Sequence, residues 1–306
     1  MKKYLVILFI TSCSLNAAAC DICGCGTGNS YIGILPDFNS HIIGMRYRRS
    51  MLQSHLGPGG SHTYLTSKEI YRVAELWGGW NLSRKIRVMA SLPFSFNERI
   101  NQSKSDTKNG LGDIVVNGYY EVVNKKSAVG KSSLLVQSLW LGAGIKLPTG
   151  KYEPADKSSG SENTNLFQLG TGSTDVLLNA MYDIRLQDAG LNVAAAYKMN
   201  TSNRYDYRYG NKFSGTAQLY YKIRINKKVL LAPNAGVQYE YSDKDHDAGT
   251  VVDISGGNMI AGTAGIETGF KNIAVGANFQ KPFSQKLANN MVRSGNRLMV
   301  HLSFTL

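Results

Sequence analysis

Residues 297–306, RLMVHLSFTL, carry the pattern that decides the fold class. Every second side chain from Leu298 to Leu306 is apolar, and those between them are mostly more polar. Successive side chains of a β-strand point to opposite faces, so this period of two predicts a strand with one apolar face. An apolar face that includes an aromatic residue, here Phe304, suits a strand in contact with lipid.

The same period recurs along the chain and predicts about twelve strands in total. No stretch carries the 3.6-residue apolar stripe that is typical of an amphipathic helix. The predicted strands are residues 39–50, 67–81, 85–97, 111–123, 133–147, 173–187, 190–200, 212–225, 229–242, 257–270, 272–283 and 297–306.

The predicted connections alternate between short and long. Tight turns such as residues 82–84 and 271–272 alternate with long polar loops such as residues 51–66, 98–110 and 148–172. Outer-membrane barrels have short periplasmic turns, longer external loops and an even number of strands. We therefore predict an all-β fold, a single antiparallel transmembrane β-barrel in the outer membrane of a Gram-negative bacterium, with outer-membrane lipid as a partner.

A soluble β-sandwich would also alternate apolar and polar side chains. Aromatic and large apolar residues near the predicted strand ends favour the membrane barrel, because such barrels carry aromatic girdles at both interfaces. The 32 glycines, 17 tyrosines and only 7 prolines among 306 residues agree with this prediction. The expected girdle residues are Tyr71, Trp77, Trp80, Phe94, Phe96, Trp140, Tyr239, Tyr241, Phe270, Phe279 and Phe283.

The formal net charge of +13 raises the question of nucleic-acid binding. The basic residues form small groups along the chain, and no recognition helix or base-stacking motif accompanies them. We therefore expect solvated turns and a basic lumen or rim, and no nucleic-acid partner.

The first residues have the pattern of a secretory signal peptide, with Lys2 and Lys3, an apolar run over residues 4–10 and three alanines at 17–19. The predicted organisation is a signal peptide at 1–19, a Cys-rich segment at 20–38 and a barrel at 39–306. Because a long connection follows the first strand, that strand runs outward. The Cys-rich segment would then face the periplasm, or fold into the lumen as a short cap or plug.

The Cys-rich segment holds Cys20, Cys23 and Cys25 in a C-x2-C-x-C arrangement, and three hypotheses for it stay open. In the periplasm two of the thiols would form a disulfide and leave one over. Lipidation is the second hypothesis, either at Cys20 or at Cys13 in an alternative lipobox at residues 10–13. In the third, the thiolates bind Cu(I), or bind Zn with a fourth ligand such as His41 or Asp21.

Three glycine-containing motifs lie in the middle of the chain: GLGDIVVNGYYEV at 110–122, LWLGAGIKLPTGKYE at 139–153 and LGTGSTDVLLNAMYDI at 169–184. Asp113, Lys146 and Asp175 in these motifs fall on the polar faces of neighbouring predicted strands. We predict a salt-bridged lumenal network among them, which would either take part in solute binding or only stabilise the barrel interior.

In order and spacing these motifs resemble the MetA-type phenol-degradation family of FadL-like outer-membrane transporters. The resemblance implies a barrel that binds or passes small molecules. The N-terminal segment resembles instead a Cys-rich leader of barrel proteins of the Bacteroidetes type.

Enzyme motifs such as a G-x-S-x-G elbow, a P-loop or H-E-x-x-H are absent from the sequence, so we expect no enzyme. The first functional hypothesis is a barrel that binds or passes a small-molecule or metal solute, linked to transition-metal (copper) handling through its cysteines. The alternative is a non-transporting structural or assembly barrel whose Cys-rich segment tethers a periplasmic protein partner.

Overall fold

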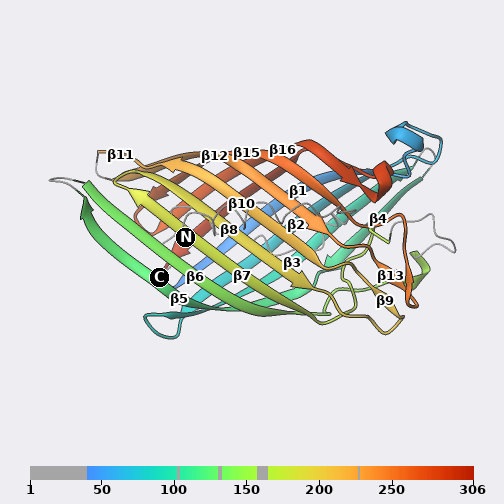
Figure 1. Ribbon diagram of the computed structural model, residues 1–306, viewed down its shortest axis with the longest axis horizontal. Helices are drawn as coiled ribbons and strands as arrows, with labels where there is room; N and C mark the ends of the chain where they lie inside the picture. The colour runs from blue at the N-terminus through green and yellow to red at the C-terminus, as the bar shows by residue number, and fades with distance from the viewer. Residues whose placement is uncertain (1–39, 102–103, 130–132, 157–164, 227) are drawn as a thin grey trace, which may run out of the picture.

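The fold is a single closed β-barrel whose antiparallel strands are steeply tilted (Figure 1). The computed structural model describes residues 40–101, 104–129, 133–156, 165–226 and 228–306. Twelve strands form the wall, which confirms the predicted fold class. The predicted signal peptide and the Cys-rich segment lie outside the described residues. Among the described residues no helix is long and apolar enough to cross a bilayer.

Each wall strand pairs with its neighbours in the chain, and the first strand pairs with the last. Two consecutive segments, β10 and β11, together make one wall strand. The wall strands are β1 (Ile42–Ser54), β2 (Ser67–Asn81), β3 (Ile86–Asn101), β5 (Ile114–Val129), β6 (Ser133–Leu147), β7 (Asp175–Leu186), β8 (Ala189–Met199), β10 (Lys212–Tyr221) with β11 (Ile223–Ile225), β12 (Val229–Ser242), β15 (Gly257–Phe270), β16 (Ile273–Leu287) and β18 (Arg297–Thr305).

Short strands and 3-10 turns lie at the end of the barrel that carries the long connections (Figure 1). They are β4 (Lys104–Leu111), β9 (Tyr207–Arg208), β13 (His246–Asp247), β14 (Thr250–Val251), β17 (Arg293–Ser294), and the 3-10 turns η1 (Pro58–Gly60), η2 (Pro154–Asp156) and η3 (Ala288–Asn290). By the predicted topology this end faces outward from the cell, and we call it the outer end.

The sequence-based prediction was wrong in two connections. Residues 98–110 were expected to form a loop, but β3 continues to Asn101 and pairs with β4. Residues 124–132, between the predicted strands 111–123 and 133–147, were expected to form only a connection, but β5 and β6 pair out to Val129 and Ser133. Side chains are mostly polar on both faces in these extensions, so the apolar period of two that reveals a membrane strand is lost there.

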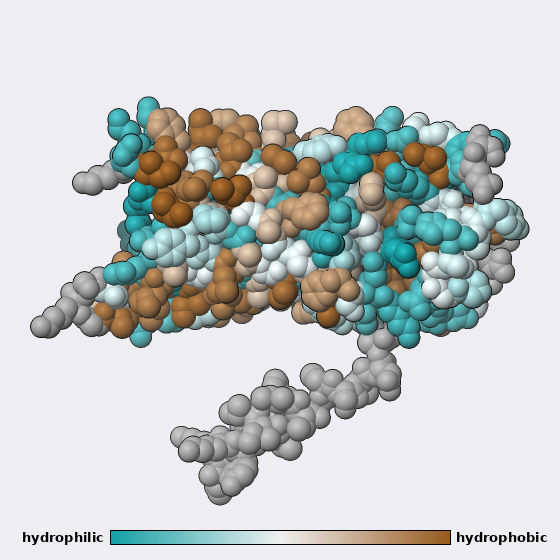
Figure 2. Space-filling view, turned by 90° about the horizontal axis from the view of Figure 1, so that it is seen from above, coloured by the Kyte–Doolittle hydropathy of each residue, from teal (hydrophilic) through white to brown (hydrophobic). Residues whose placement is uncertain are grey.

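The two faces of the wall differ as the period of two predicts. In β1, Ile42 is fully buried in the lumen, whereas Ile43 and Met45 are 36% and 60% exposed on the outside. Figure 2 shows apolar side chains over the part of the wall with the short turns and hydrophilic ones over the outer end. The apolar band covers the wall segment that lipid contacts.

Three of the expected girdle residues lie inside the barrel instead. Tyr71, Trp77 and Trp140 are only 1%, 4% and 4% exposed, whereas Trp80, Phe94 and Phe96 face outward with 42–46% exposure. Position near a strand end does not fix the face of a side chain. Tyr71 and Trp77 share the face of Glu69 and Glu75, as the spacing of two residues in β2 requires.

The lumen near the short turns is filled by an apolar cluster of Ile42, Trp77, Met89, Tyr119 and Trp140. Glycine on the facing strand makes room for one of its rings. A Cβ on Gly142 would lie 2.6 Å from Cδ1 of Tyr119, whose side chain is 2% exposed. Gly142 therefore leaves the space that the Tyr119 ring occupies.

Gly142→Ala should destabilise the barrel by about 1–3 kcal/mol, because the buried Tyr119 ring must shift to admit the methyl group. Gly262→Ala is the matched control, since a Cβ there would meet nothing within 4 Å. Urea unfolding of both variants in lipid vesicles measures the difference. Equal stability of the two variants would contradict the conclusion that Gly142 makes room for the Tyr119 ring.

Candidate functional site

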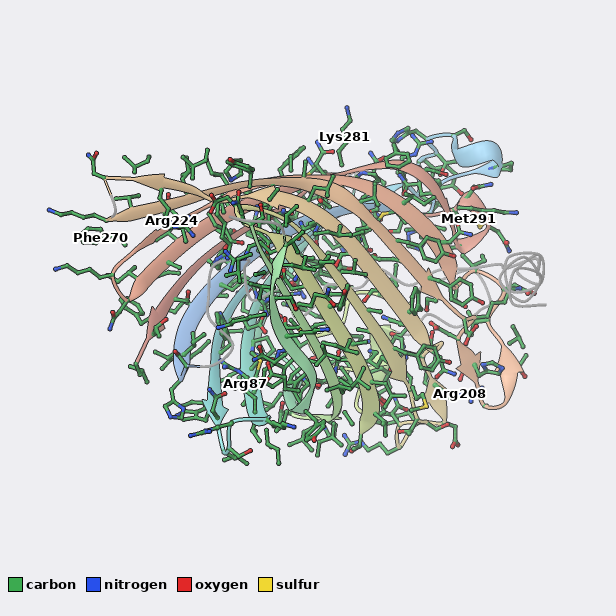
Figure 3. All side chains as sticks on the ribbon, turned by 60° about the vertical axis from the view of Figure 1, so that its left-hand side comes forward. Arg87, Arg208, Arg224, Phe270, Lys281 and Met291 are labelled. Atoms are coloured by element: carbon green, nitrogen blue, oxygen red, sulfur yellow. The ribbon has the colours of Figure 1, made fainter. Side chains whose placement is uncertain are left out.

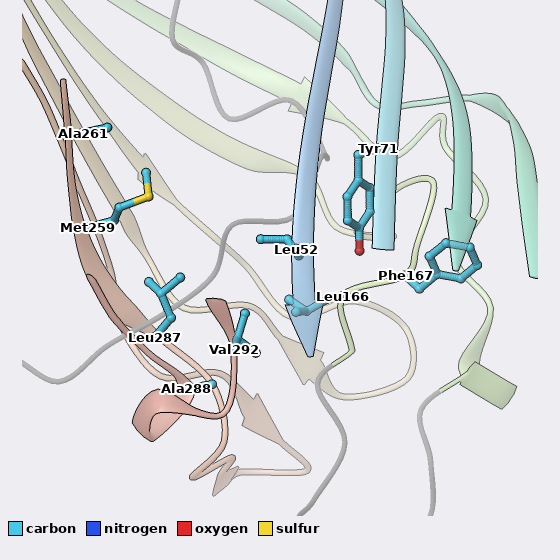
Figure 4. Close-up of a cluster of buried hydrophobic side chains, with 9 residues drawn as sticks. All are labelled: Leu52, Tyr71, Leu166, Phe167, Met259, Ala261, Leu287, Ala288 and Val292. Atoms are coloured by element: carbon cyan, nitrogen blue, oxygen red, sulfur yellow. The ribbon is translucent and has the colours of Figure 1, made fainter. Parts of the chain in front are cut away.

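The described part of the connection between β6 and β7, residues 148–156 and 165–174, lies at the outer end of the barrel and partly enters it. Its Leu166 and Phe167 are 4% and 2% exposed and belong to a buried apolar cluster (Figure 4). We call this the mouth cluster: Leu52, Tyr71, Leu166, Phe167, Met259, Ala261, Leu287, Ala288 and Val292. The loop thereby supplies apolar side chains to the inside of the barrel wall.

Asp113, directly before β5, holds both ends of this loop. Its Oδ1 accepts a hydrogen bond from the backbone N–H of Gly150 at 3.0 Å, and its Oδ2 accepts one from the N–H of Thr171 at 2.9 Å. The carboxylate is 8% exposed. A buried carboxylate that accepts hydrogen bonds from several N–H groups holds the surrounding backbone in position.

Lys146 lies between Asp113 and Asp175 in the same buried network. Its Nζ is 2.7 Å from Oδ2 of Asp113 and 3.0 Å from Oδ2 of Asp175, and it donates to the carbonyl of Ser173 at 2.9 Å. Lys198 stands 3.9 Å from the same Asp175 oxygen. The structure thus brings together the three lumenal residues singled out in the sequence, and we call this network the loop latch.

Glycines of the motifs allow the loop to fold onto itself at the latch. A Cβ on Gly150 would lie 2.8 Å from Cα of Gly170, and a Cβ on Gly170 would lie 2.4 Å from Oδ1 of Asp113. Gly172 adopts φ +71°, where a side chain is strained. The P-T-G and L-G-T-G-S motifs therefore meet at a backbone contact that only glycine permits.

The Phe167 side chain belongs to the mouth cluster and also lines an outer cleft. Its ring packs edge-on against Tyr71 at 6.4 Å between centroids, while the guanidinium of Arg99 lies 4.3 Å above it. On that side opens a cleft of about 450 Å³. The cleft is lined by Arg99, Asp106, Thr107, Lys108, Asn109, Lys151, Glu153, Phe167 and Leu169.

The cleft carries a charged pair on one side. Lys108 is 3.0 Å from Glu153, which also contacts Lys151. Hydrogen bonds from Lys151 and Lys108 hold the pKa of Glu153 below its usual range, and burial lowers the pKa of Lys108. Since a lowered carboxyl pKa keeps Glu153 ionised at mildly acidic pH, the pair persists until the pH falls through that lowered pKa.

A row of mostly ionisable residues runs around the inner face of the wall, deeper in the barrel. In register, Glu267 pairs with Gly276, Gly276 with His301, His301 with Arg46 and Arg46 with Glu75 across five adjacent strands. Arg46 holds Glu75 through two hydrogen bonds of 2.8 and 3.1 Å.

The glycine in this row has a steric role. A Cβ on Gly276 would lie 2.4 Å from the His301 ring and 2.7 Å from the Glu267 side chain. Its absence of a side chain lets these two residues share the space above it. We call the five residues the lumenal row.

The expected metal ligands are only partly within the described residues. Cys20, Cys23 and Cys25 lie outside them, and among the described residues no group of three or more His, Cys, Asp or Glu is arranged to hold a metal. His41 precedes β1 at the end with the short turns. Its Nδ1 accepts a hydrogen bond from the N–H of Asn81 at 3.2 Å.

Several site residues were not singled out in the sequence. Phe167 sits in a polar loop with no periodic pattern, so nothing local marked it as buried. Glu75, Glu267 and His301 could have been found, because each is an ionisable residue within a strand whose alternate positions are apolar.

Lys146→Met should cost about 3–5 kcal/mol of stability, because it leaves the buried Asp113 without its cation and leaves Asp175 with only the more distant Lys198. It should also expose the 148–174 loop to protease. Lys151→Met, at a side chain 72% exposed in its ion pair, should change stability by less than about 0.5 kcal/mol. Urea unfolding and limited proteolysis read out both effects, and a protease-resistant loop in Lys146→Met would argue against the latch.

The barrel resembles solved outer-membrane structures. It superposes on the COG4313 outer membrane channel from Pseudomonas putida F1 with a TM-score of 0.62 at 14% identity, covering 92% of this chain and 99% of that one. The β domain of the Bordetella autotransporter BrkA gives a TM-score of 0.45 at 10% identity, with 87% and 100% coverage. The first of these likenesses supports the fold. No curated protein matches the sequence.

The family comparison covers most of the barrel. The model described as "Putative MetA-pathway of phenol degradation" matches residues 61–286, which include the loop latch, the outer cleft and most of the lumenal row. The location in the outer membrane of a Gram-negative bacterium agrees with this match and with the fold. The chain is an outer-membrane β-barrel that belongs to the family of the MetA pathway of phenol degradation.

Proposed function

We propose that the barrel admits a small amphipathic organic solute from the outside, with Phe167 as the gate. The observation that carries this proposal is that Phe167 separates the outer cleft from the mouth cluster. Displacement of the Phe167 ring would open the outer cleft toward the mouth cluster and the lumen behind it.

The chemistry on both sides of the gate suits a solute with an apolar body and a polar or anionic group. The cleft offers the Phe167 ring beside the cations of Arg99 and Lys108. A lumenal pocket beside the mouth cluster combines apolar Leu177 and Met259 with the charged Lys198. Ligand sites of this kind are mostly apolar, with a few placed polar groups that set orientation.

The lumenal row supports a polar route through the membrane segment. Arg46 and Glu75 are 8% and 6% exposed, and Glu267 and His301 are 1% and 3% exposed. Ionisable side chains at membrane depth are costly, and they commonly mark substrate or ion pathways. The row gives a solute that leaves the mouth a set of hydrogen-bonding groups.

Phe167→Ala should raise the solute flux several-fold in proteoliposomes and should cost about 3–5 kcal/mol of stability through the lost burial. Flux is measured by liposome swelling with small aromatic acids and with sugars of similar size. A larger gain for the aromatic acids is the expected result, because the cleft pairs an aromatic face with cations.

Phe270→Ala is the matched control, since Phe270 is an aromatic residue on the lipid-facing surface, 43% exposed, and lines neither the outer cleft nor the lumenal pocket. It should leave flux unchanged. If the folded wild type and Phe167→Ala are both impermeable to every solute, the gate does not exist and a non-transporting barrel is favoured.

We further propose that Cys20, Cys23 and Cys25 bind Cu(I) or Zn at the periplasmic side, with His41 as the fourth ligand for Zn. His41 precedes β1 at the end of the barrel where the predicted topology puts the Cys-rich segment. Its Nδ1 accepts a hydrogen bond from the N–H of Asn81, so this nitrogen carries a lone pair, and Zn would take the place of the Asn81 N–H there.

Metal analysis of the mature protein should find bound metal that is lost when the three cysteines are changed to serine. His41→Ala should lower affinity for Zn more than for Cu(I), which thiolates alone can hold. Native mass spectrometry separates the competing hypotheses, because acylation and a disulfide change the mass in different ways. A metal-free chain that takes up neither Cu nor Zn would contradict the metal site.

A further inference from the structure

In the part of the chain that the structure describes, the lipid-facing cations of the outer half of the wall lie on one side of the barrel. On β16, β17, β1 and β2, the alternation of buried and exposed positions puts six basic side chains on the outer surface. They are Arg49, Lys68, Arg72, Lys281, Lys286 and Arg293, and we call them the basic face. Lys281 points away from the wall in Figure 3.

Cross-strand register places these residues in two rows. In the lower row Arg49 lies directly opposite Arg72. In the upper row Gln53 pairs with Arg293 on one side and with Lys68 on the other. Directly opposed side chains have Cβ atoms about 4.5–5.5 Å apart, and like charges at that separation repel one another.

Few carboxylates offset these charges. Residues 41–66 and 281–297 contain no Asp or Glu, and this includes both external connections of the basic face. The two connections touch each other, because the N–H of Leu56 donates to the carbonyl of Met291 at 3.0 Å. On the outer surface, Glu98 meets Arg72 at 2.9 Å, while Glu69 and Glu75 point into the lumen.

The basic face lies at the depth of the membrane interface. Lys281 stands between Phe279 and Phe283, which are 44% and 65% exposed. Arg72 is opposite Phe96, another exposed aromatic residue. Aromatic girdles mark the headgroup level of a barrel, so the cations lie where lipid headgroups meet the wall.

The other side of the barrel has the reverse arrangement. On β8, β10 and β12 the outward residues near the outer end include Tyr197, Phe213 and Tyr239. The cations of these strands at that level, Lys198 and Lys212, face the lumen and are 4% and 6% exposed. A general need for solubility at the outer rim would not confine the lipid-facing cations to four adjacent strands.

We propose that the basic face binds the phosphate groups of the phosphorylated glycolipid of the outer leaflet, the lipid A part of lipopolysaccharide. Arg49 and Arg72 hold one phosphate between them, and Arg293, Lys286 and Lys68 surround a second one above it. Lys281, between two aromatic rings, contacts the junction of headgroup and acyl chain. The bound phosphates relieve the repulsion between the opposed cations, and the acyl chains run down the apolar band below.

The test uses the purified full-length barrel in non-ionic detergent, with lipid binding followed by native mass spectrometry. The variant Arg49→Gln, Arg72→Gln, Arg293→Gln should lose roughly 100-fold in affinity for bis-phosphorylated lipid A, given the usual contribution of each interfacial cation. Dephosphorylated lipid A and phosphatidylethanolamine should bind weakly to the wild type and the variant alike.

The matched control removes three cations at the periplasmic end, Lys125→Gln, Lys126→Gln and Lys228→Gln, and should keep wild-type affinity. Heat-modifiable migration on gels verifies that each variant is folded. Should the arginine variant not fold, Lys281→Gln with Lys286→Gln, at two exposed positions, should lose roughly 30-fold. Wild-type affinity in the folded variants, or equal binding of dephosphorylated lipid A, would overturn the proposal.

Discussion

The need to satisfy every backbone N–H and C=O inside a bilayer is the constraint on which the whole structure depends. Strands can meet it only in a closed ring, because an open sheet would expose an unpaired edge to lipid. The pairing of β1 with β18 joins the two ends of the wall and leaves no edge. Closure also fixes two faces for each strand, so that each residue of the membrane segment faces either lipid or lumen.

The lumen that closure creates is occupied at three levels, each built in a different way. Apolar rings fill the end with the short turns, where glycines on facing strands provide the space. The lumenal row lies farther along, and the mouth cluster lies at the outer end. The loop latch holds that last level in place, since Asp113 bonds both ends of the loop that carries Phe167. A latch of this kind lets a long polar loop present two apolar side chains at a defined position. The latch also connects the three glycine-containing motifs with the mouth, because residues of all three motifs meet at the buried carboxylate of Asp113.

Charge is arranged by face as well as by level. Inside, cations are matched by carboxylates, as in the contacts of Arg46 with Glu75 and of Arg297 with Glu240. On the outer surface the basic face has few carboxylates beside it. Part of the net charge of +13 lies in the short turns, as at the exposed Arg84, Lys85 and Lys271, and part lies on the basic face. The expectation of solvated turns and a basic lumen or rim did not distinguish the two faces of the wall, because composition carries no information about which face a charge occupies.

Alternation of apolar and polar residues by itself determined the class of fold, the positions of the wall strands and the end at which the loops are long. It did so because lipid contact imposes a period of two that local sequence records directly. The pattern also marked Asp113, Lys146 and Asp175 as residues of one polar interior. Only the tertiary structure decided that Tyr71, Trp77 and Trp140 face inward, that Phe167 enters the mouth, and that six distant cations share one outer surface. These features depend on register between strands and on the path of a long loop, which are set by contacts between residues far apart in the chain.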